Sequence, residues 1–228
     1  ESGRRENTIV IVTSDHGDML GERGMWFKMS FLEHSARVPL IVHAPKMFSA
    51  KRVQEAVSLV DLLPTFVELA NDGKQGDYVT PIEGRSLMIH LSGGKGHDEV
   101  IGEYFAEAIA TPMFMIRRGC KKFIYADGDP LQYYDLSEDP HEHNNLANDP
   151  TCATEVRKLM DEISSRYNQD ALRLKILESQ RRRRFIKGVM HEQKIAWDYS
   201  PLRDAKREYI RNNMPVYQLE KRARFPQV

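Results

Sequence analysis

The first clear pattern along the chain is an apolar run, Ile-Val-Ile-Val at residues 9–12, which ends in the polar sequence Thr-Ser-Asp-His-Gly. A short apolar run without alternation, closed by turn residues, is typical of a strand covered on both faces, as in a parallel sheet. We therefore predict a fully buried parallel strand over residues 8–14. That strand would present Asp15 and His16 at its carboxyl end, where ligands bind in open α/β sheets.

Similar patterns predict the elements that follow. Residues 38–43 form a second apolar run and are expected to be the next buried strand. Apolar positions recur with helical spacing over residues 60–70, where Asp61 is a favourable N-cap and Pro64 falls in the first turn. Residues 71–98 are polar and rich in glycine, which indicates a linker.

Beyond the linker, short apolar segments alternate with turn sequences such as Arg-Gly and Asp-Gly-Asp-Pro, a pattern that predicts an antiparallel sheet. The predicted strands cover residues 99–105, 112–117, 121–126 and 131–135. The pair Asp149 and Pro150 is expected to begin a long helix that continues to about residue 186. The linker would thus separate two strands and a helix from an antiparallel sheet with a helix of its own.

Composition and charge narrow the class of protein. Hydrophobic residues make up 41% of the 228 residues, which is enough for a core. The formal net charge is zero, but residues 171–228 carry 15 Lys and Arg against 6 Asp and Glu, a net of +9, so residues 1–170 carry −9. A basic tail therefore follows an acidic body. No apolar segment approaches the roughly 18 residues of a membrane span, so none is expected.

The cysteines and the N-terminus bear on location and completeness. Cys120 and Cys152 do not make a disulfide framework, so a reduced, cytoplasmic protein is expected. The N-terminal sequence Glu-Ser-Gly-Arg-Arg-Glu-Asn lacks the apolar core of a signal peptide and leads almost directly into the first predicted strand. We therefore expect the chain to be the C-terminal part of a longer protein.

The adjacent pair Asp15 and His16 is the first candidate for chemistry. Successive side chains on a strand point to opposite faces, so both can reach one ion only if the strand ends there and the backbone turns. Gly17 permits such a turn. A hard cation such as Ca²⁺ or Mg²⁺ favours the carboxylate oxygen, whereas the imidazole suits a more borderline metal.

The spacing downstream is more specific than the Ser-Asp-His-Gly sequence alone. Lys28 begins a Lys-x4-Glu-x3-Arg-x-Pro pattern whose fixed positions include Glu33 and Arg37, and an apolar strand follows. The strand, Ser-Asp-His-Gly and this pattern together resemble type I sulfatases of the alkaline phosphatase superfamily. The resemblance implies that Asp15 and His16 are two metal ligands, with Ca²⁺ the usual metal and Mn²⁺ or Mg²⁺ as alternatives. It also implies that Lys28 binds the sulfate ester and offsets charge on the leaving oxygen, and that Glu33 and Arg37 form a supporting pair.

Other segments extend the resemblance over nearly the whole chain. The sequence at residues 134–146 resembles the sulfatase signature Tyr-Asp-Leu-x-x-Asp-Pro-x-Glu-x-x-Asn-Leu. The loop at residues 18–26 and the last segment, residues 197–226, resemble bacterial choline-sulfatases, and phosphonate monoester hydrolases share the loop. The family implies an α/β, alkaline phosphatase-like fold.

This fold implies a division of the chain into three regions. Residues 1–98 would be the C-terminal part of the catalytic domain and of its central, mostly parallel sheet. Residues 99–186 would be the antiparallel subdomain with the long helix, and residues 187–228 an extended choline-sulfatase-like tail.

Part of the family's catalytic machinery has no counterpart in this sequence. Sulfatases use a formylglycine nucleophile made within Cys/Ser-x-Pro/Ala-x-Arg, and neither Cys120 nor Cys152 lies in that pattern. The family's N-terminal aspartate ligands have no counterpart either. We therefore expect the formylglycine in a missing N-terminal part, and we expect the isolated chain not to hydrolyse sulfate esters.

The choline-sulfatase resemblance implies a substrate and a partner. The substrate would be choline O-sulfate, hydrolysed to choline and sulfate. A quaternary ammonium is recognised by aromatic faces and carboxylates, for which Glu103, Glu107 and Glu220 are candidates. Glu103 and Glu107 are equally consistent with a structural role. The extended tail would reach a neighbouring subunit, which implies a homo-oligomer.

Alternative functions remain open at this point. One is a phosphonate monoester hydrolase or phosphodiesterase of the same superfamily, and another is a non-catalytic module whose basic tail binds an acidic partner. Residues 181–184 are four arginines, but cations are favoured near a helix C-terminus, and no nucleic-acid-binding motif is present, so we expect no nucleic-acid partner. His141 and His143 resemble a metal pair, although exposed turn residues are the simpler interpretation.

Overall fold

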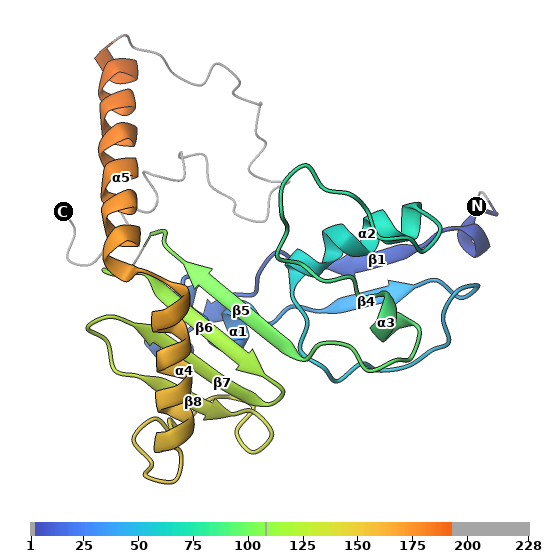
Figure 1. The fold of residues 1–228 in the computed structure, drawn as a ribbon, viewed down its shortest axis with the longest axis horizontal. Helices are drawn as coiled ribbons and strands as arrows, with labels where there is room; N and C mark the ends of the chain where they lie inside the picture. Colours follow the sequence, from blue (N-terminus) through green and yellow to red (C-terminus); the bar gives the residue numbers. More distant parts are fainter. Residues whose placement is uncertain (1–2, 108, 193–228) are drawn as a thin grey trace, which may run out of the picture. The chain divides into compact units, whose positions relative to one another are not determined.

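The computed structural model describes residues 3–107 and 109–192 of the 228-residue chain (Figure 1). The chain divides into two compact units, residues 1–176 and residues 177–228. The strands lie in the first unit, and the greater part of helix α5 (Gln169–Glu192) belongs to the second.

The first two long strands pair with each other, and they run antiparallel. Strand β1 (Val10–Thr13) lies beside β4 (Leu40–His43) with Val10 opposite His43 and Thr13 opposite Leu40. The predicted strands exist, but the parallel pairing was wrong. An apolar run reports how hydrophobic a strand is and carries no information about the direction of its neighbour.

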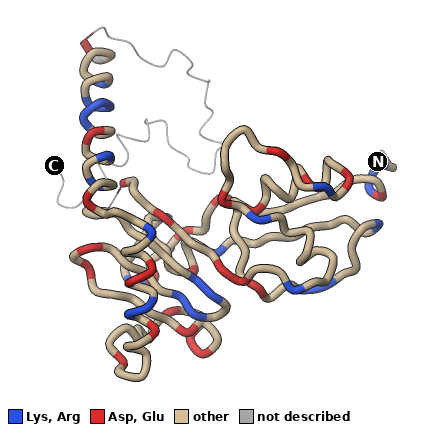
Figure 2. The backbone as a smooth tube through the Cα atoms, in the orientation of Figure 1, with Lys and Arg blue, Asp and Glu red and all other residues tan. Residues whose placement is uncertain are grey.

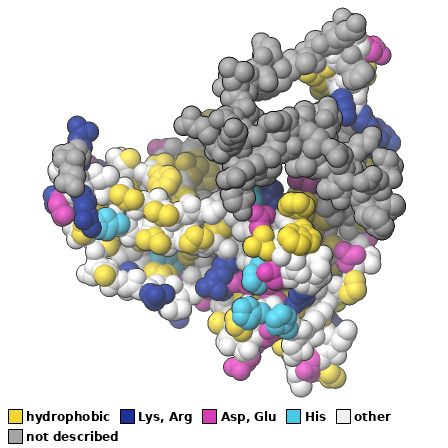
Figure 3. All heavy atoms as spheres, turned by 180° about the vertical axis from the view of Figure 1, so that it is seen from behind, with side chains coloured by type: hydrophobic (Ala, Val, Ile, Leu, Met, Phe, Trp, Pro, Cys, Tyr) yellow, Lys and Arg dark blue, Asp and Glu magenta, His cyan; other side chains and the backbone are white. Residues whose placement is uncertain are grey.

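The predicted burial of these strands is also not seen in this chain. Val12 is 52% exposed and Ile41 is 59% exposed. Apolar side chains gather on the surface drawn in Figure 3, and several exposed ones belong to β1, β4 and α2 (Leu62–Ala70). These strands therefore have the composition of a sheet interior and an apolar face open to further contacts.

Short elements fill the connection from β1 to β4. The hairpin of β2 (Met19–Leu20) and β3 (Trp26–Phe27) comes first, closed by the 3-10 turn η2 (Glu22–Gly24). Helix α1 (Glu33–Ala36) then leads into β4. Another 3-10 turn, η1 (Arg5–Asn7), precedes β1.

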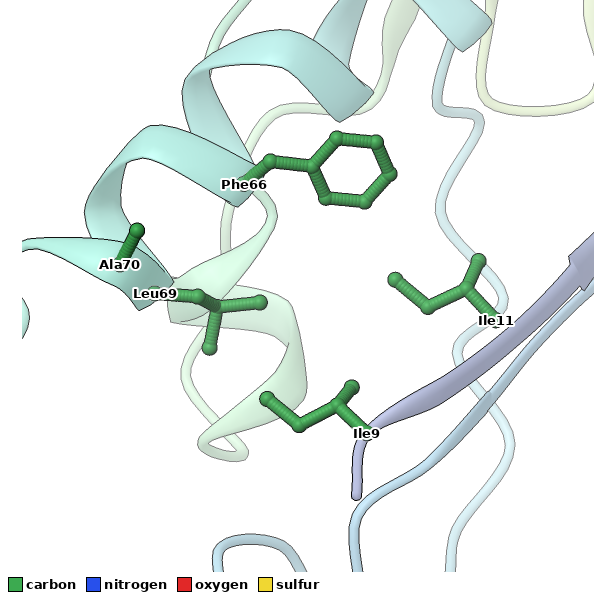
Figure 4. Close-up of a pocket in the computed structure, with 5 residues that line it drawn as sticks. All are labelled: Ile9, Ile11, Phe66, Leu69 and Ala70. Carbon is green, nitrogen blue, oxygen red and sulfur yellow. The ribbon is translucent and has the colours of Figure 1, made fainter.

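Helix α2 confirms the prediction for residues 60–70. The 3-10 turn η3 (Leu59–Asp61) leads into it, and the backbone N–H of Ser58 donates to the Asp61 carboxylate at 2.8 Å. Figure 4 shows Phe66 and Leu69 of α2 directed toward Ile9 and Ile11 across a cavity of ≈ 450 Å³. The cavity is lined by apolar side chains alone, so it holds no groups for catalysis.

The segment predicted as a linker is packed against α2 instead. It contains α3 (Met88–Leu91), and Leu87 and His90 are buried. The N–H of Leu87 donates to the Thr65 hydroxyl at 2.8 Å, and the N–H of Arg85 donates to the Asp61 carboxylate at 2.8 Å. Polar composition suggested a loop, but these hydrogen bonds attach the segment to α2.

The buried His90 makes stability depend on pH. Burial, and then the neighbouring His97, lower the pKa of the His90 ring below its ordinary value of 6.5, and neither ring nitrogen has a partner among the described residues. Unfolded His90 takes up a proton near pH 6.5, whereas the folded ring takes it up only at lower pH. The free energy of unfolding should therefore fall as the pH drops below about 6.5, and His90→Leu should flatten that dependence in urea titrations. An equal flattening by His141→Leu, an exposed control, would contradict this.

The predicted antiparallel sheet is confirmed. Its order is β5-β6-β7-β8, with every neighbouring pair antiparallel. The strands are β5 (Glu99–Tyr104), β6 (Met113–Arg118), β7 (Lys121–Ala126) and β8 (Gln132–Asp135).

The two faces of this sheet bury different parts of the chain. One face holds Phe114, Ile116 and Phe123 against Leu159 and Ile163 of helix α4 (Ala153–Arg166). The other face is lined by the set Met115, Ile124 and Tyr134, which packs against Met19 and Leu32. The loop between β1 and β4 is therefore attached to the face opposite α4.

The single long helix predicted from residue 150 is divided into two. Helix α4 ends at Arg166, and α5 begins at Gln169. The Tyr167 ring lies 4.4 Å from the Phe114 ring in the core, and the Asn168 side chain accepts the N–H of Ala171 at 3.0 Å. Since asparagine at an N-cap starts a new helix, residue 168 separates the two.

Helix α5 also corrects the beginning of the predicted tail. It continues to Glu192, so residues 187–192 are helical, and the rest of the predicted tail lies outside the described residues. Figure 2 shows Lys and Arg along α5, in agreement with the exposed set Arg181–Arg184. Among the described residues no helix is both long and apolar enough to cross a membrane.

Candidate functional site

Asp15 and His16 converge where β1 ends. The Asp15 carboxylate lies 3.4 Å from Nε2 of His16, and it accepts the backbone N–H of His16 at 3.0 Å. The Ser14 hydroxyl donates to the His16 carbonyl at 2.8 Å, which closes the turn. The backbone turn thus brings together two side chains that a continuing strand would direct to opposite faces.

The Asp15 carboxyl is both exposed and ionised. Its side chain is 84% exposed. Partial desolvation raises the pKa of Asp15, but the charge of His16 and the hydrogen bonds from its own amide, the His16 amide and Ser14 lower it, and the resulting pKa is below the ordinary value. The carboxylate is therefore charged at neutral pH and free to bind a cation.

Gly17 allows this turn to lie directly against α1. A Cβ at Gly17 would fall 2.1 Å from the carbonyl oxygen of His34, closer than any real contact. The Gly17 N–H donates to the carbonyl of Ser35 at 2.8 Å. The backbone of Gly17 is not left-handed, so the glycine is required by the space and not by its φ angle.

Lys28 is held near the same helix by its backbone. It follows the β2–β3 hairpin with its side chain exposed, and its carbonyl accepts the Ser35 hydroxyl at 2.6 Å. The same carbonyl accepts the N–H of Ser30 at 2.8 Å. One residue of α1, Ser35, therefore contacts the backbones of both the Asp15–His16 turn and the Lys28 segment.

Glu33 is buried, and its main partners come from the antiparallel sheet. Its carboxylate accepts Lys122 Nζ at 2.9 Å and Arg117 at 3.2 Å. The expected pair with Arg37 is present at 3.7 Å, but Arg37 is largely exposed. Arg37 therefore contributes less to holding Glu33 than Lys122 does.

Lys122 joins two buried carboxylates. It is 1% exposed, and its ammonium lies 2.9 Å from Glu33 and 2.9 Å from Glu142. Glu142 also accepts the backbone N–H of Glu33 at 2.7 Å. Lys122 was not among the site residues predicted from the sequence, where the available signal was a lysine at an inward-facing position of the apolar strand β7.

Two known protein families match parts of this sequence. The family described as "N-sulphoglucosamine sulphohydrolase, C-terminal" matches residues 21–169, more than half of the chain. This chain belongs to the sulfatase family. The resemblance seen in the Lys28 pattern is thereby confirmed. The family described as "Choline sulfatase enzyme C terminal" matches residues 174–225 of this sulfatase chain.

Similar proteins agree with the assignment to this family, and the chain matches only part of the length of each. The choline-sulfatase of Rhizobium meliloti is 37% identical over 97% of this chain and 44% of its own sequence. A Bacteroides thetaiotaomicron protein described as a sulfatase superposes with a TM-score of 0.62 at 32% identity, over 73% of this chain and 38% of its own. The phosphonate monoester hydrolase of Agrobacterium radiobacter gives 0.60 at 26% identity, over 72% and 35%. The predicted alkaline phosphatase-like fold is confirmed, and the sulfatase chain spans less than half of each relative.

The donor atoms of this sulfatase chain fit part of a divalent-cation site. An ionised carboxylate and an imidazole nitrogen lie within 3.4 Å of each other. Ca²⁺ takes about 6 to 8 oxygen ligands, so Asp15 and His16 are a partial set. Among the described residues there is no group of three or more His, Cys, Asp or Glu side chains that could hold a metal. Further ligands would have to come from elsewhere.

Of the acids expected to meet choline, Glu103 belongs to β5, Glu107 follows that strand, and Glu220 is not among the described residues. Glu103 shares a sheet face with Phe114, and its carboxylate accepts the Tyr167 hydroxyl at 2.6 Å. Glu107 is exposed, and its backbone carbonyl accepts the Tyr104 hydroxyl at 3.0 Å. A substrate-binding role for these acids stays a prediction.

Three exposed histidines lie near α1. The His34 ring is 6.0 Å from the His141 ring, and the His141 ring is 5.8 Å from the His143 ring. The rings of His34 and His141 are stacked, with 14° between their planes. Among the described residues these histidines form no group of three that could hold a metal ion. This agrees with the interpretation of His141 and His143 as exposed turn residues.

Proposed function

We propose that this chain supplies one side of a sulfatase active site and that the complete protein hydrolyses choline O-sulfate. The observation that carries the proposal is the attachment of two segments to one helix. Gly17, next to the Asp15–His16 pair, and Lys28 both bond through their backbones to Ser35 of α1, so the proposed cation ligands and an exposed lysine are attached to one helix. A bound cation and a lysine ammonium can both stabilise the negative charge that develops on the oxygens of a sulfate ester during hydrolysis.

Asp15 and His16 would hold the cation, for which we propose Ca²⁺, with Mn²⁺ or Mg²⁺ as alternatives. When bound, such a cation supplies a Lewis acid to the ester oxygens. Lys28 would donate hydrogen bonds to the sulfate and offset charge that develops on the leaving oxygen. The buried ion pairs of Lys122 with Glu33 and Glu142 would keep α1 in place.

The remaining parts of the site would come from outside residues 1–228. The formylglycine pattern is found around neither Cys120 nor Cys152. The apolar face of β1 and β4 supports the same proposal, because exposed apolar strands favour contact with further chain.

The choline part of the proposal rests on the C-terminal region. The choline-sulfatase family matches residues 174–225, and the Rhizobium meliloti relative is a choline-sulfatase. Glu103, Glu107 and Glu220 are the proposed contacts for the quaternary ammonium, and a homo-oligomer formed through the tail is the proposed assembly. A phosphonate monoester hydrolase is the second candidate, favoured by the structural match to the Agrobacterium radiobacter enzyme.

Lys28→Ala tests the proposal in the protein encoded by the complete reading frame. Removing one preorganised donor should lower kcat for choline O-sulfate by about 10²–10³-fold. The measurement is steady-state release of sulfate, with Lys46→Ala, an exposed lysine that follows β4, as the control.

The same assay separates the two candidates. Faster turnover of a phosphonate monoester or a phosphate diester than of choline O-sulfate would replace the proposed substrate with the second candidate. An unchanged kcat in Lys28→Ala would remove Lys28 from the site.

A further inference from the structure

Ser35 is a buried polar residue between Glu33 and Arg37 of the Lys28 pattern. It is 2% exposed and belongs to α1. Its hydroxyl donates to the carbonyl of Lys28 at 2.6 Å, and its own carbonyl accepts the N–H of Gly17 at 2.8 Å. These two bonds use different atoms, so they can be separated by mutation.

The helix that carries Ser35 is fixed on its other side. Glu33, two residues earlier, is bound by Lys122 at 2.9 Å, and its backbone N–H is bound by Glu142 at 2.7 Å. Lys122 and Glu142 are both 1% exposed. These contacts attach α1 to the antiparallel sheet and to Glu142, so the backbone of Ser35 is held from the side opposite the Lys28 segment.

The segment that receives the Ser35 hydroxyl is strained and otherwise lightly held. Phe27, directly before Lys28, has a φ of 69°, a left-handed conformation that is costly for an aromatic residue. The side chains of Trp26 and Phe27 are exposed, so packing does little to hold them. The hydrogen bond from the Ser35 hydroxyl to the Lys28 carbonyl therefore helps to fix the position of the Lys28 backbone, from which the side chain extends.

We propose that Ser35 is a positioning residue that places the Lys28 ammonium relative to the Asp15–His16 turn. The inference rests on the proposed role of Lys28 at the ester. Ser35 contacts no reacting group itself, and it acts through the Lys28 backbone. A lysine has a long, flexible side chain, so a fixed backbone origin limits the space that its ammonium samples.

The test uses Ser35→Ala in the protein encoded by the complete reading frame. The hydroxyl is lost, whereas alanine keeps the backbone carbonyl that holds Gly17. We expect kcat to fall roughly 10- to 100-fold, as a displacement of about 1 Å does, while the Kd for Ca²⁺ measured by calorimetry changes less than about threefold. Ser165→Ala is the control, since this exposed serine also donates its hydroxyl to a backbone carbonyl, that of Glu162, at 2.8 Å, and lies on α4.

A double-mutant cycle with Lys28→Ala distinguishes positioning from general loosening. If Ser35 acts through Lys28, Ser35→Ala should change kcat by less than about twofold in the Lys28→Ala background. An equal loss of kcat in both backgrounds would overturn the proposal, and so would a parallel weakening of Ca²⁺ binding. Retained kcat in the single variant would overturn it too. Ser35→Cys, which keeps the size and a weak donor, should fall between Ser35→Ala and the unchanged protein.

Hydrogen exchange tests the same inference if the complete protein hydrolyses neither class of ester. The Ser30 amide donates to the Lys28 carbonyl, and the Gly17 amide donates to the Ser35 carbonyl. In Ser35→Ala the Ser30 amide should exchange about tenfold faster, while exchange at Gly17 stays the same. Unchanged exchange at Ser30 would overturn the positioning role, whereas accelerated exchange in an inactive protein would contradict only the proposed function.

Discussion

Lys122→Met should lower the free energy of unfolding by about 3–5 kcal/mol, as removal of one partner from a buried ion pair does. Lys122 is 1% exposed and joins Glu33 and Glu142, each at 2.9 Å. Methionine fills a similar volume, so the loss comes from two carboxylates left buried without their shared cation and not from a cavity. Urea-induced unfolding followed by circular dichroism gives the value.

The neighbouring residue provides a matched control. Lys121 stands on the same strand, faces the other way and pairs with Asp135 at the surface. Lys121→Met should cost no more than about 1 kcal/mol, the usual range for exposed pairs. Adding Glu33→Gln and Glu142→Gln to Lys122→Met should restore part of the loss, because the buried charges are removed together. Equal effects of the two lysine variants would show that Lys122 is not the centre of a buried network.

Gly17→Ala should lower kcat/KM by at least about 10²-fold in the complete protein, because a misplacement of about 1 Å has effects of that size. The added methyl would lie 2.1 Å from the His34 carbonyl oxygen. Backbone is the obstacle here, so the turn that carries Asp15 and His16 must move away from α1. Ca²⁺ affinity should weaken together with activity, which calorimetry would measure.

This result would differ in kind from that of Ser35→Ala. Gly17→Ala acts on the cation-binding turn, whereas Ser35→Ala is expected to leave Ca²⁺ binding intact. Gly188→Ala is the control, since a Cβ at Gly188 meets no atom of the described residues within 4 Å. The Gly188→Ala variant should be slightly more stable than the unchanged protein, because Gly188 lies in α5 and alanine is the better helix former. Full Ca²⁺ affinity in Gly17→Ala would show that the close contact with α1 is not needed for the turn.

The sequence by itself determined the local elements and the family. Alternating apolar and turn segments predicted the four strands β5 to β8, and the helical spacing of residues 60–70 predicted α2. These are short-range patterns, set by the side-chain periods of strands and helices. The Lys28 pattern, which is read directly from the sequence, also led to the prediction that Glu33 is a supporting residue.

Only the tertiary structure decided which elements are partners. The apolar run of β1 did not reveal that β4 lies antiparallel to it, and helical spacing did not reveal the break at Asn168, where Tyr167 enters the core. Polar composition suggested a linker for residues 71–98, although hydrogen bonds tie part of it to α2. Each of these outcomes depends on residues distant in sequence.

Some residues of the candidate site were predicted from the sequence, and others were found only in the structure. Asp15, His16 and Lys28 were predicted from motifs that lie close together along the chain. Lys122 and Glu142 were invisible as partners of Glu33, as they lie 89 and 109 residues away along the chain. Local order follows from the sequence through backbone geometry, whereas buried charge pairs and close backbone contacts exist only after the chain has folded, because folding alone brings those atoms within hydrogen-bonding distance.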